Sequence, residues 1–182
     1  MRWPTGRARR LPRTGAGLTT RQQQEKPDGY DQGIDGQSTL DGFEKSIELQ
    51  SFSHGIAQMV TSNPSNSERT TGGPSHSELS VSKCVDIASC PLIAACNEGK
   101  LLKEVTLTVG RVDNGKLLPI VVYKLENVLI SSISHSGGGG RPMESLSLNY
   151  TKIEWSYTEQ DPEVKKKGNN GAVWDLTKDK GK

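Results

Sequence analysis

Apolar and polar residues alternate along much of the chain, and this alternation predicts strands that each bury one face. The first begins at Ser46 and changes phase at residues 50–51, which indicates a bulge. Asn114 and Gly115 form the dipeptide that is typical of a tight hairpin turn. Further strands are predicted at residues 78–82, 104–109, 117–133 and 144–158, the last with a second phase change at 151–152.

One short helix is predicted among these strands. Ser89 can cap it, Pro91 suits its first turn, Leu92 and Ala95 share a face, and Gly99 can end it. A single helix among many strands predicts a mainly all-β domain, either a barrel or a sandwich.

The two ends of the chain lack this periodicity. Residues 1–33 are rich in Gly, Arg, Gln, Thr and Pro, so we expect a disordered leader and a fold that begins near Ile34. Residues 161–182 are rich in Lys, Gly, Asn and Asp, with one apolar island around Trp174, and they predict a flexible tail with one docking element. The predicted domain therefore covers residues 34–160.

Charged residues are also distributed unevenly between the leader and the rest of the chain. The net charge is +2, but residues 1–26 carry seven Arg and Lys against Glu25, a net of +6, which leaves −4 for the rest. A basic leader can bind nucleic acid or anionic lipid, or it can be a solvated tail or an upstream extension that the cell never makes. The acidic domain offers no nucleic-acid surface. Without a signal-peptide pattern or an apolar span, a soluble, cytoplasmic protein is expected.

The chemistry-bearing residues do not form a catalytic pattern. His54, His76 and His135 are scattered, and we expect no active site from them. Cysteines at 84, 90 and 96 match neither a zinc site nor an even-numbered disulfide framework, so reduced structural thiols are expected. The glycine run 137–140 lacks the Lys-Ser/Thr pair of a phosphate loop. We therefore predict no enzyme, metal or cofactor; a site around the cysteines is the weakest alternative.

Several segments, in order, resemble the Hcp family, the hemolysin-coregulated tube proteins of bacterial type VI secretion systems. The resemblance covers about residues 34–160. Its segments are IELQSFSHG at 47–55, LSVSKCVD at 79–86, ASCPL at 88–92, ACNEGK at 95–100, LENVLISS at 125–132 and ESLSLNY at 144–150.

The resemblance implies a β-barrel of two sheets with one short α-helix alongside, and a structural role without catalysis. It implies that six copies form a ring and that rings stack into a tube, as in a phage tail. A contractile sheath would eject this tube with a VgrG spike at its tip and small effectors in its lumen. The protein would be cytoplasmic before firing and secreted afterwards.

The resemblance also suggests roles for two sets of residues. Ser53 takes the position that faces the lumen and contacts cargo, although an ordinary polar strand position is the competing interpretation. The long polar loop at Thr61–Ser75 takes the position of the loop that reaches the next ring. Its residues are Thr61, Ser62, Asn63, Pro64, Ser65, Asn66, Ser67, Glu68, Arg69, Thr70, Thr71, Gly72, Gly73, Pro74 and Ser75.

The chain departs from the family pattern at its first strand. The turn GIDGQS at 33–38 is kept, but the apolar strand that precedes it in relatives is replaced by polar residues at 28–32. Its loss would leave an unpaired sheet edge and predicts a weakened hexamer or a monomer. The alternative function is a non-assembling adaptor or carrier barrel whose leader binds a partner or nucleic acid.

Overall fold

The computed structural model describes residues 14–20, 33–60, 71–113, 116–160, 166–178 and 180–181, which form twelve strands and one helix. The elements are β1 (Thr14–Thr20), β2 (Ile47–Leu49), β3 (Ser51–Ser53), β4 (Ile56–Val60), β5 (Thr71–His76), β6 (Leu79–Cys84), α1 (Ser89–Glu98), β7 (Leu102–Asp113), β8 (Lys116–Ser136), β9 (Met143–Asn149), β10 (Lys152–Gln160), β11 (Lys166–Asp175) and β12 (Lys180–Gly181).

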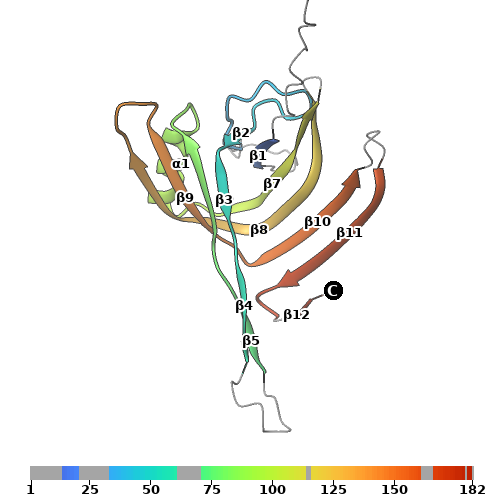
Figure 1. The fold of residues 1–182 in the computed structure, drawn as a ribbon. Coiled ribbons are helices and arrows are strands. Elements are labelled where there is room, and N and C mark those ends of the chain that lie inside the picture. The colour runs from blue at the N-terminus through green and yellow to red at the C-terminus, as the bar shows by residue number, and fades with distance from the viewer. Residues whose placement is uncertain are drawn as a thin grey trace, which may run out of the picture.

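β8 joins two curved sheets that wrap one core (Figure 1). Its first part pairs with β7 and β10, and its last part, from Leu129 onward, pairs with β9. The first sheet runs β12-β11-β10-β8-β7-β1-β2, and the second runs β8-β9-β6-β3. The strand predicted at residues 117–133 is confirmed, and β8 contains this whole range.

The predicted barrel consists of two sheets that meet along residues 47–53, and no single sheet closes on itself. β2 pairs with β1 in the first sheet, whereas β3 pairs with β6 in the second. The chain passes from one sheet to the other at Gln50, whose N–H donates to the Ser82 carbonyl oxygen at 2.8 Å. This is the phase change predicted at 50–51. The all-β, two-sheet class with one helix is confirmed.

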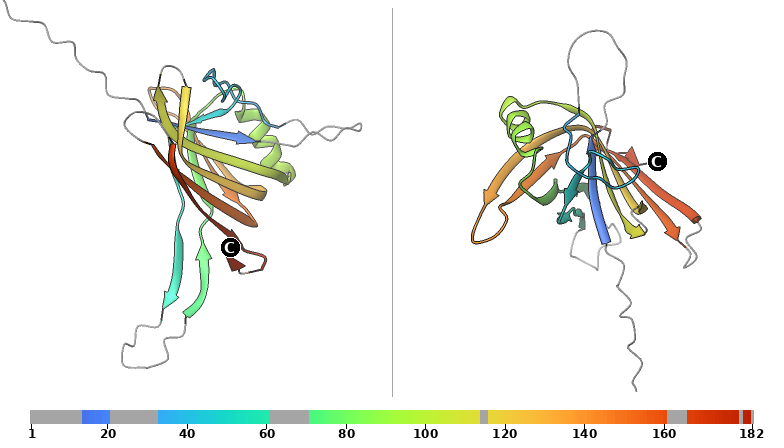
Figure 2. Two further views of the ribbon diagram at one scale, coloured as in Figure 1. Left: turned by 90° about the vertical axis from the view of Figure 1, so that its right-hand side faces the viewer. Right: turned by 90° about the horizontal axis from the view of Figure 1, so that it is seen from above.

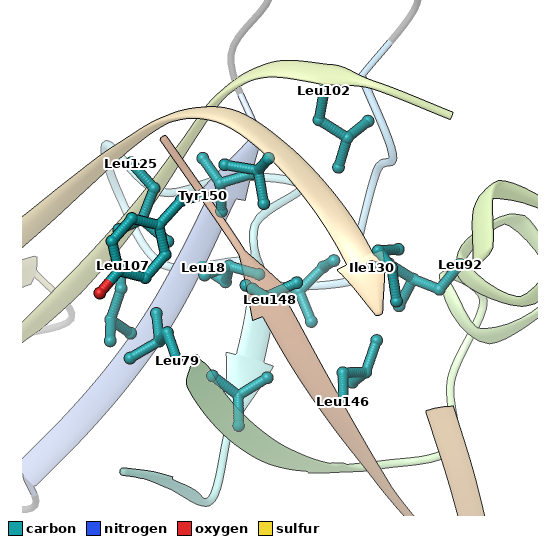
Figure 3. Close-up of a cluster of buried hydrophobic side chains, with 14 of the residues drawn as sticks. Leu18, Leu79, Leu92, Leu102, Leu107, Leu125, Ile130, Leu146, Leu148 and Tyr150 are labelled. Atoms are coloured by element: carbon teal, nitrogen blue, oxygen red, sulfur yellow. The ribbon is translucent and has the colours of Figure 1, made fainter. Parts of the chain in front are cut away.

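The core lies between the inner faces of the two sheets (Figure 3). Leu79, Leu107 and Leu125 have no exposed surface, and burial of each such side chain stabilises the fold by about 1.5–3 kcal/mol. Leu92 of α1 lies next to Ile130 of β8, so the helix extends this core. The helix ends at Gly99 as predicted, in a left-handed conformation with φ 61°.

The leader was predicted to be disordered and to lack a strand, and this is wrong for residues 14–20. β1 lies between β2 and β7 and is antiparallel to both, so the sheet has a strand in this place. Backbone hydrogen bonds hold a strand whatever its side chains, which is why a segment rich in Thr and Gly escaped detection. Residues 1–13 and 21–32 lie outside the described residues.

The C-terminal segment was predicted to be a flexible tail, and this too is wrong for most of it. β11 pairs with β10 along its whole length, so residues 166–175 extend the first sheet. Trp174 and Leu176 pack against the core, which confirms the predicted docking element. Gly, Asn and Lys give β11 no alternation, and its pairing depends on the backbone.

The prediction of a loop over Thr61–Ser75 is wrong for its last five residues. Residues 71–75 belong to β5, which pairs with β4 in a separate two-stranded sheet. This hairpin projects from the body of the molecule (Figures 1 and 2). Residues 61–70 lie outside the described residues.

Candidate functional site

Two rows of serines cross the outer face of the second sheet. Four strands contribute to each row, because residues that lie directly opposite one another across β3, β6, β9 and β8 are serines. The first row is Ser53, Ser80, Ser147 and Ser132, and the second row is Ser51, Ser82, Ser145 and Ser134. We call these eight residues the serine face.

Side chains alternate between the two faces of each strand, and the serine face lies on the side away from the core. On β9, Leu146 and Leu148 are buried, whereas Ser145, which lies between buried Glu144 and buried Leu146, is exposed. Ser53 is exposed in the same way, and its neighbour Phe52 packs against the core. The Oγ atoms of Ser51 and Ser82 lie 2.6 Å apart. Strands about 4.8 Å apart and serines about 7 Å apart along each strand make this a regular surface of hydroxyl groups.

A polar network forms one rim of the serine face. Glu78, which precedes β6, accepts hydrogen bonds from Ser131 Oγ at 2.7 Å and from Asn149 Nδ2 at 3.1 Å. Ser131 is the extra residue of a bulge in β8, and beyond it Ser132 regains the register of the row. The face itself has no charged side chain at its eight positions, so Glu78 marks its boundary.

A buried ion cluster lies behind the second row. Lys83 Nζ donates to Glu144 Oε1 at 2.5 Å, to Asp86 Oδ1 at 2.6 Å and to the Cys84 carbonyl oxygen at 2.9 Å. Ser89 Oγ donates to Glu144 Oε1 at 3.0 Å, so the residue predicted to cap the helix joins this cluster instead. Ala88 is the N-cap, without a side-chain hydrogen bond.

The cluster has a structural role, because it connects β6, β9 and the start of α1. The lysine donates to one acceptor on β9, one on β6 and one, Asp86, in the connection between β6 and α1. On the other side of Glu144, Oε2 lies 3.2 Å from Nε2 of His135, which is partly exposed. The cluster was not predicted from the sequence, although Lys83 shares the buried parity of Leu79 and Val81.

His54 and His76 come together, contrary to the prediction that the histidines are scattered. Their ring centroids are 6.2 Å apart, because the antiparallel pairing of β4 with β5 brings the start of β4 next to the end of β5. His76 also stacks on Trp174 with centroids 6.1 Å apart, and His54 lies 6.1 Å from Trp155. These four rings connect the base of the hairpin to β10 and β11.

A hydrogen-bond chain fixes the state of His54. Tyr150 Oη donates to the Ser77 carbonyl oxygen at 3.1 Å, so it accepts from His54 Nε2 at 2.6 Å, and Nε2 carries the proton. Burial, with a smaller contribution from nearby His76, lowers the pKa of His54. Burial also raises the pKa of Tyr150 to about 12. Both groups are therefore neutral at pH 7.

The hairpin above this cluster exposes apolar side chains. Ile56, Met59 and Val60 are 52%, 75% and 50% exposed, and all belong to β4. Gly55 and Ser77 close the base of the hairpin, where the Ser77 N–H donates to the Gly55 carbonyl oxygen at 2.9 Å. The hairpin therefore presents a protruding apolar strand.

The three cysteines, Cys84, Cys90 and Cys96, are free thiols, and Cys84 Sγ accepts a hydrogen bond from Gln50 Nε2 at 2.9 Å. Among the described residues, no group of three or more His, Cys, Asp or Glu side chains is placed to hold a metal ion. Within the same ranges, no helix has the length and apolar character that a membrane crossing requires.

Comparisons with known proteins agree with this architecture. Protein hcp1 of Pseudomonas aeruginosa is 30% identical over 93 residues, which are 50% of this chain and 57% of that relative. The chain thus aligns with little more than half of that relative's length. A solved structure of a type six secretion system protein is 27% identical, with a TM-score of 0.79 over 92% of this chain and 99% of that one.

A second solved structure shares the fold, and a family model matches directly. Hcp1 from Salmonella typhimurium has a TM-score of 0.70 at 21% identity, over 93% of this chain and 99% of that one. Residues 27–157 match the family described as type VI secretion system effector, Hcp, a range that contains the serine face and leaves β1 outside. The chain therefore belongs to the Hcp family of type VI secretion system effectors.

Proposed function

We propose that this protein is a structural subunit of a type VI secretion tube, in which six copies form a ring and rings stack. Its role in this proposal is mechanical: the serine face lines the lumen, and Ser53 is one of its cargo-facing residues. Family membership supports the assembly, and the two serine rows support the wall. The ejected tube would be secreted through the type VI apparatus, with sheath, spike and small effectors as its partners.

The chemistry of the serine face suits a wall along which cargo moves. Hydroxyl groups both donate and accept hydrogen bonds, so they can replace water around a polar cargo surface. Each such exchange has a net value of only about 0.5–1.5 kcal/mol. A face of hydroxyl groups, with no charged side chain at its eight positions, therefore holds cargo weakly and releases it.

The hairpin of β4 and β5 is the element that we assign to ring stacking. Contact with a neighbouring ring would remove the exposed apolar surface of Met59 and its apolar neighbours from water. This burial would stabilise the stacked rings. The assignment includes the predicted stacking residues Thr61–Ser75, of which 61–70 lie outside the described residues. β1 also removes the reason to expect a monomer, since the edge of β7 is paired.

Electron microscopy of the purified full chain tests the assembly. Six-fold rings or stacked tubes are expected. Small particles that remain monodisperse at high concentration would contradict the proposal, and salt-sensitive DNA retention by such particles would favour the adaptor alternative.

Cysteine labelling tests which face lines the lumen. In a background with Cys84→Ser, Cys90→Ser and Cys96→Ala, we compare Ser53→Cys with a restored Cys90, which is exposed on α1. Assembled rings should protect the cysteine at 53 from a large polyethylene glycol maleimide while a small maleimide still reacts, and the cysteine at 90 should react with both. Equal reaction of both sites with the large reagent in assembled rings would show that the serine face does not line the lumen.

A further inference from the structure

β1 precedes the residues that the family model matches. It occupies the groove between β2 and β7, and residues 14–20 precede the matched range, which begins at residue 27. All seven of its residues lie opposite residues of β7, and Ala16, Gly17 and Leu18 also lie opposite β2. Without it, both neighbouring strands would present unpaired backbone groups.

The groove selects its strand mainly through the backbone. The sequence TGAGLTT has one large apolar residue, Leu18, which is buried opposite Ile47 and Leu107. Gly17 adds no side chain, although the space beside it would admit one, since an added Cβ would lie no closer than 3.6 Å to Ser46 Oγ. The groove therefore requires an antiparallel strand with one leucine in register, which any copy of this chain can supply.

The connection after β1 is long enough to reach a neighbouring copy. Twelve residues, 21–32, separate Thr20 from Gly33, where the described chain resumes. An extended chain of that length spans about 45 Å, compared with about 30 Å for the diameter of a small domain. The sequence that follows β1 therefore does not confine this strand to its own subunit.

We propose that the groove between β2 and β7 is a strand-acceptor site that takes β1 from a second copy of this chain. An exchanged strand makes the same hydrogen bonds and buries the same leucine as the strand of the same subunit, so exchange loses none of its contacts. Donation in one direction links copies head to tail, and such a chain of contacts closes when the copies form a ring. The strand would then connect subunits that otherwise touch only through their surfaces.

Disulfide trapping between different copies tests this exchange. Thr19 lies opposite Thr106, and Thr14 lies opposite Arg111, which gives two independent cysteine pairs. In the background without native cysteines, Thr19→Cys chains and Thr106→Cys chains are unfolded together, refolded and oxidised. A covalent dimer on a non-reducing gel is expected. The Thr14→Cys and Arg111→Cys pair repeats the test if the first variants fail to refold.

Two controls separate exchange from collision. Thr19→Cys chains mixed with Ser156→Cys chains should give no dimer, because Ser156 lies on β10, outside the groove. The double variant with both cysteines of a pair shows whether the strand binds in register at all. Closure within single copies, with no dimer in the mixtures, would overturn the proposal, as would failure of the double variants to close. Rings seen by microscopy without these dimers would leave the tube function intact and reject strand exchange alone.

Discussion

Lys83 Nζ on β6 lies 2.5 Å from Glu144 Oε1 on β9, and neither side chain is more than 1% exposed. Asp86 Oδ1 lies 2.6 Å from the same nitrogen, so one buried ammonium group faces two carboxylates. A buried charge is tolerated only when its partners replace the water it has lost. These contacts therefore hold the second sheet and the start of α1 in one arrangement.

Lys83→Met should destabilise the protein by about 3–5 kcal/mol, because it leaves two buried carboxylates without their cation. Urea unfolding followed by circular dichroism measures the change. Lys45→Met is the matched control: its partner Asp35 is 3.1 Å away, but both side chains are largely exposed. That variant should change stability by less than about 1 kcal/mol. Equal effects of the two substitutions would contradict a structural role for the buried cluster.

The free energy of unfolding should depend on pH through His54. Burial and His76 lower its pKa in the folded protein below the ordinary 6.5, so the unfolded chain takes up a proton first as the pH falls. The contribution to stability is present above about pH 6.5 and is lost as the pH falls toward the lower folded pKa. His54→Gln should flatten this slope. His76→Gln should reduce it, because the smaller electrostatic cause of the shift is gone.

The fold was predictable from sequence where side chains alternate, and not where the backbone alone decides. Leu79 and Val81 predict β6 because buried side chains on one face of a strand recur every second residue. The Thr, Gly and Asn residues of β1 and β11 show no such alternation, so the sequence does not predict these strands. The resemblance singled out Ser53 alone, and the other seven residues of the serine face could be found only from the register between β3, β6, β9 and β8. The approach of His54 to His76 likewise depends on how the hairpin returns the chain.

Charge pairs placed on the serine face should report its register. Ser80 lies directly opposite Ser147, so Ser80→Lys with Ser147→Glu should show a favourable coupling of about 0.2–1 kcal/mol in a double-mutant cycle. Ser80→Glu with Ser147→Glu should show an unfavourable coupling of similar size. The control pair Ser51→Lys with Ser134→Glu joins the two outermost strands and should show almost none. Coupling in the control pair alone would refute the register.

Met59→Asp should weaken ring stacking without weakening the subunit. Met59 is 75% exposed in the single chain, so its replacement should change the free energy of unfolding by no more than about 0.5 kcal/mol. In tubes, a carboxylate would have to be buried against the next ring, which costs free energy unless it finds a partner. Ile87→Asp is the matched control, an exposed apolar residue outside the hairpin. Electron microscopy should show shorter tubes for Met59→Asp only; unchanged tube lengths would exclude the hairpin from stacking.

Leu18→Ala should destabilise the fold by about 2–5 kcal/mol, because Leu18 is the one large apolar residue of β1 and only 5% of it is exposed. The cavity it leaves would adjoin Ile47 and Leu107, which cannot move without disturbing the pairs they form with β1. Leu101→Ala, at a site 52% exposed, should cost less than about 0.5 kcal/mol. Urea unfolding of both variants decides whether β1 belongs to the folded core. Equal, small losses would mean that the strand contributes pairing without packing, and that the groove recognises the backbone alone.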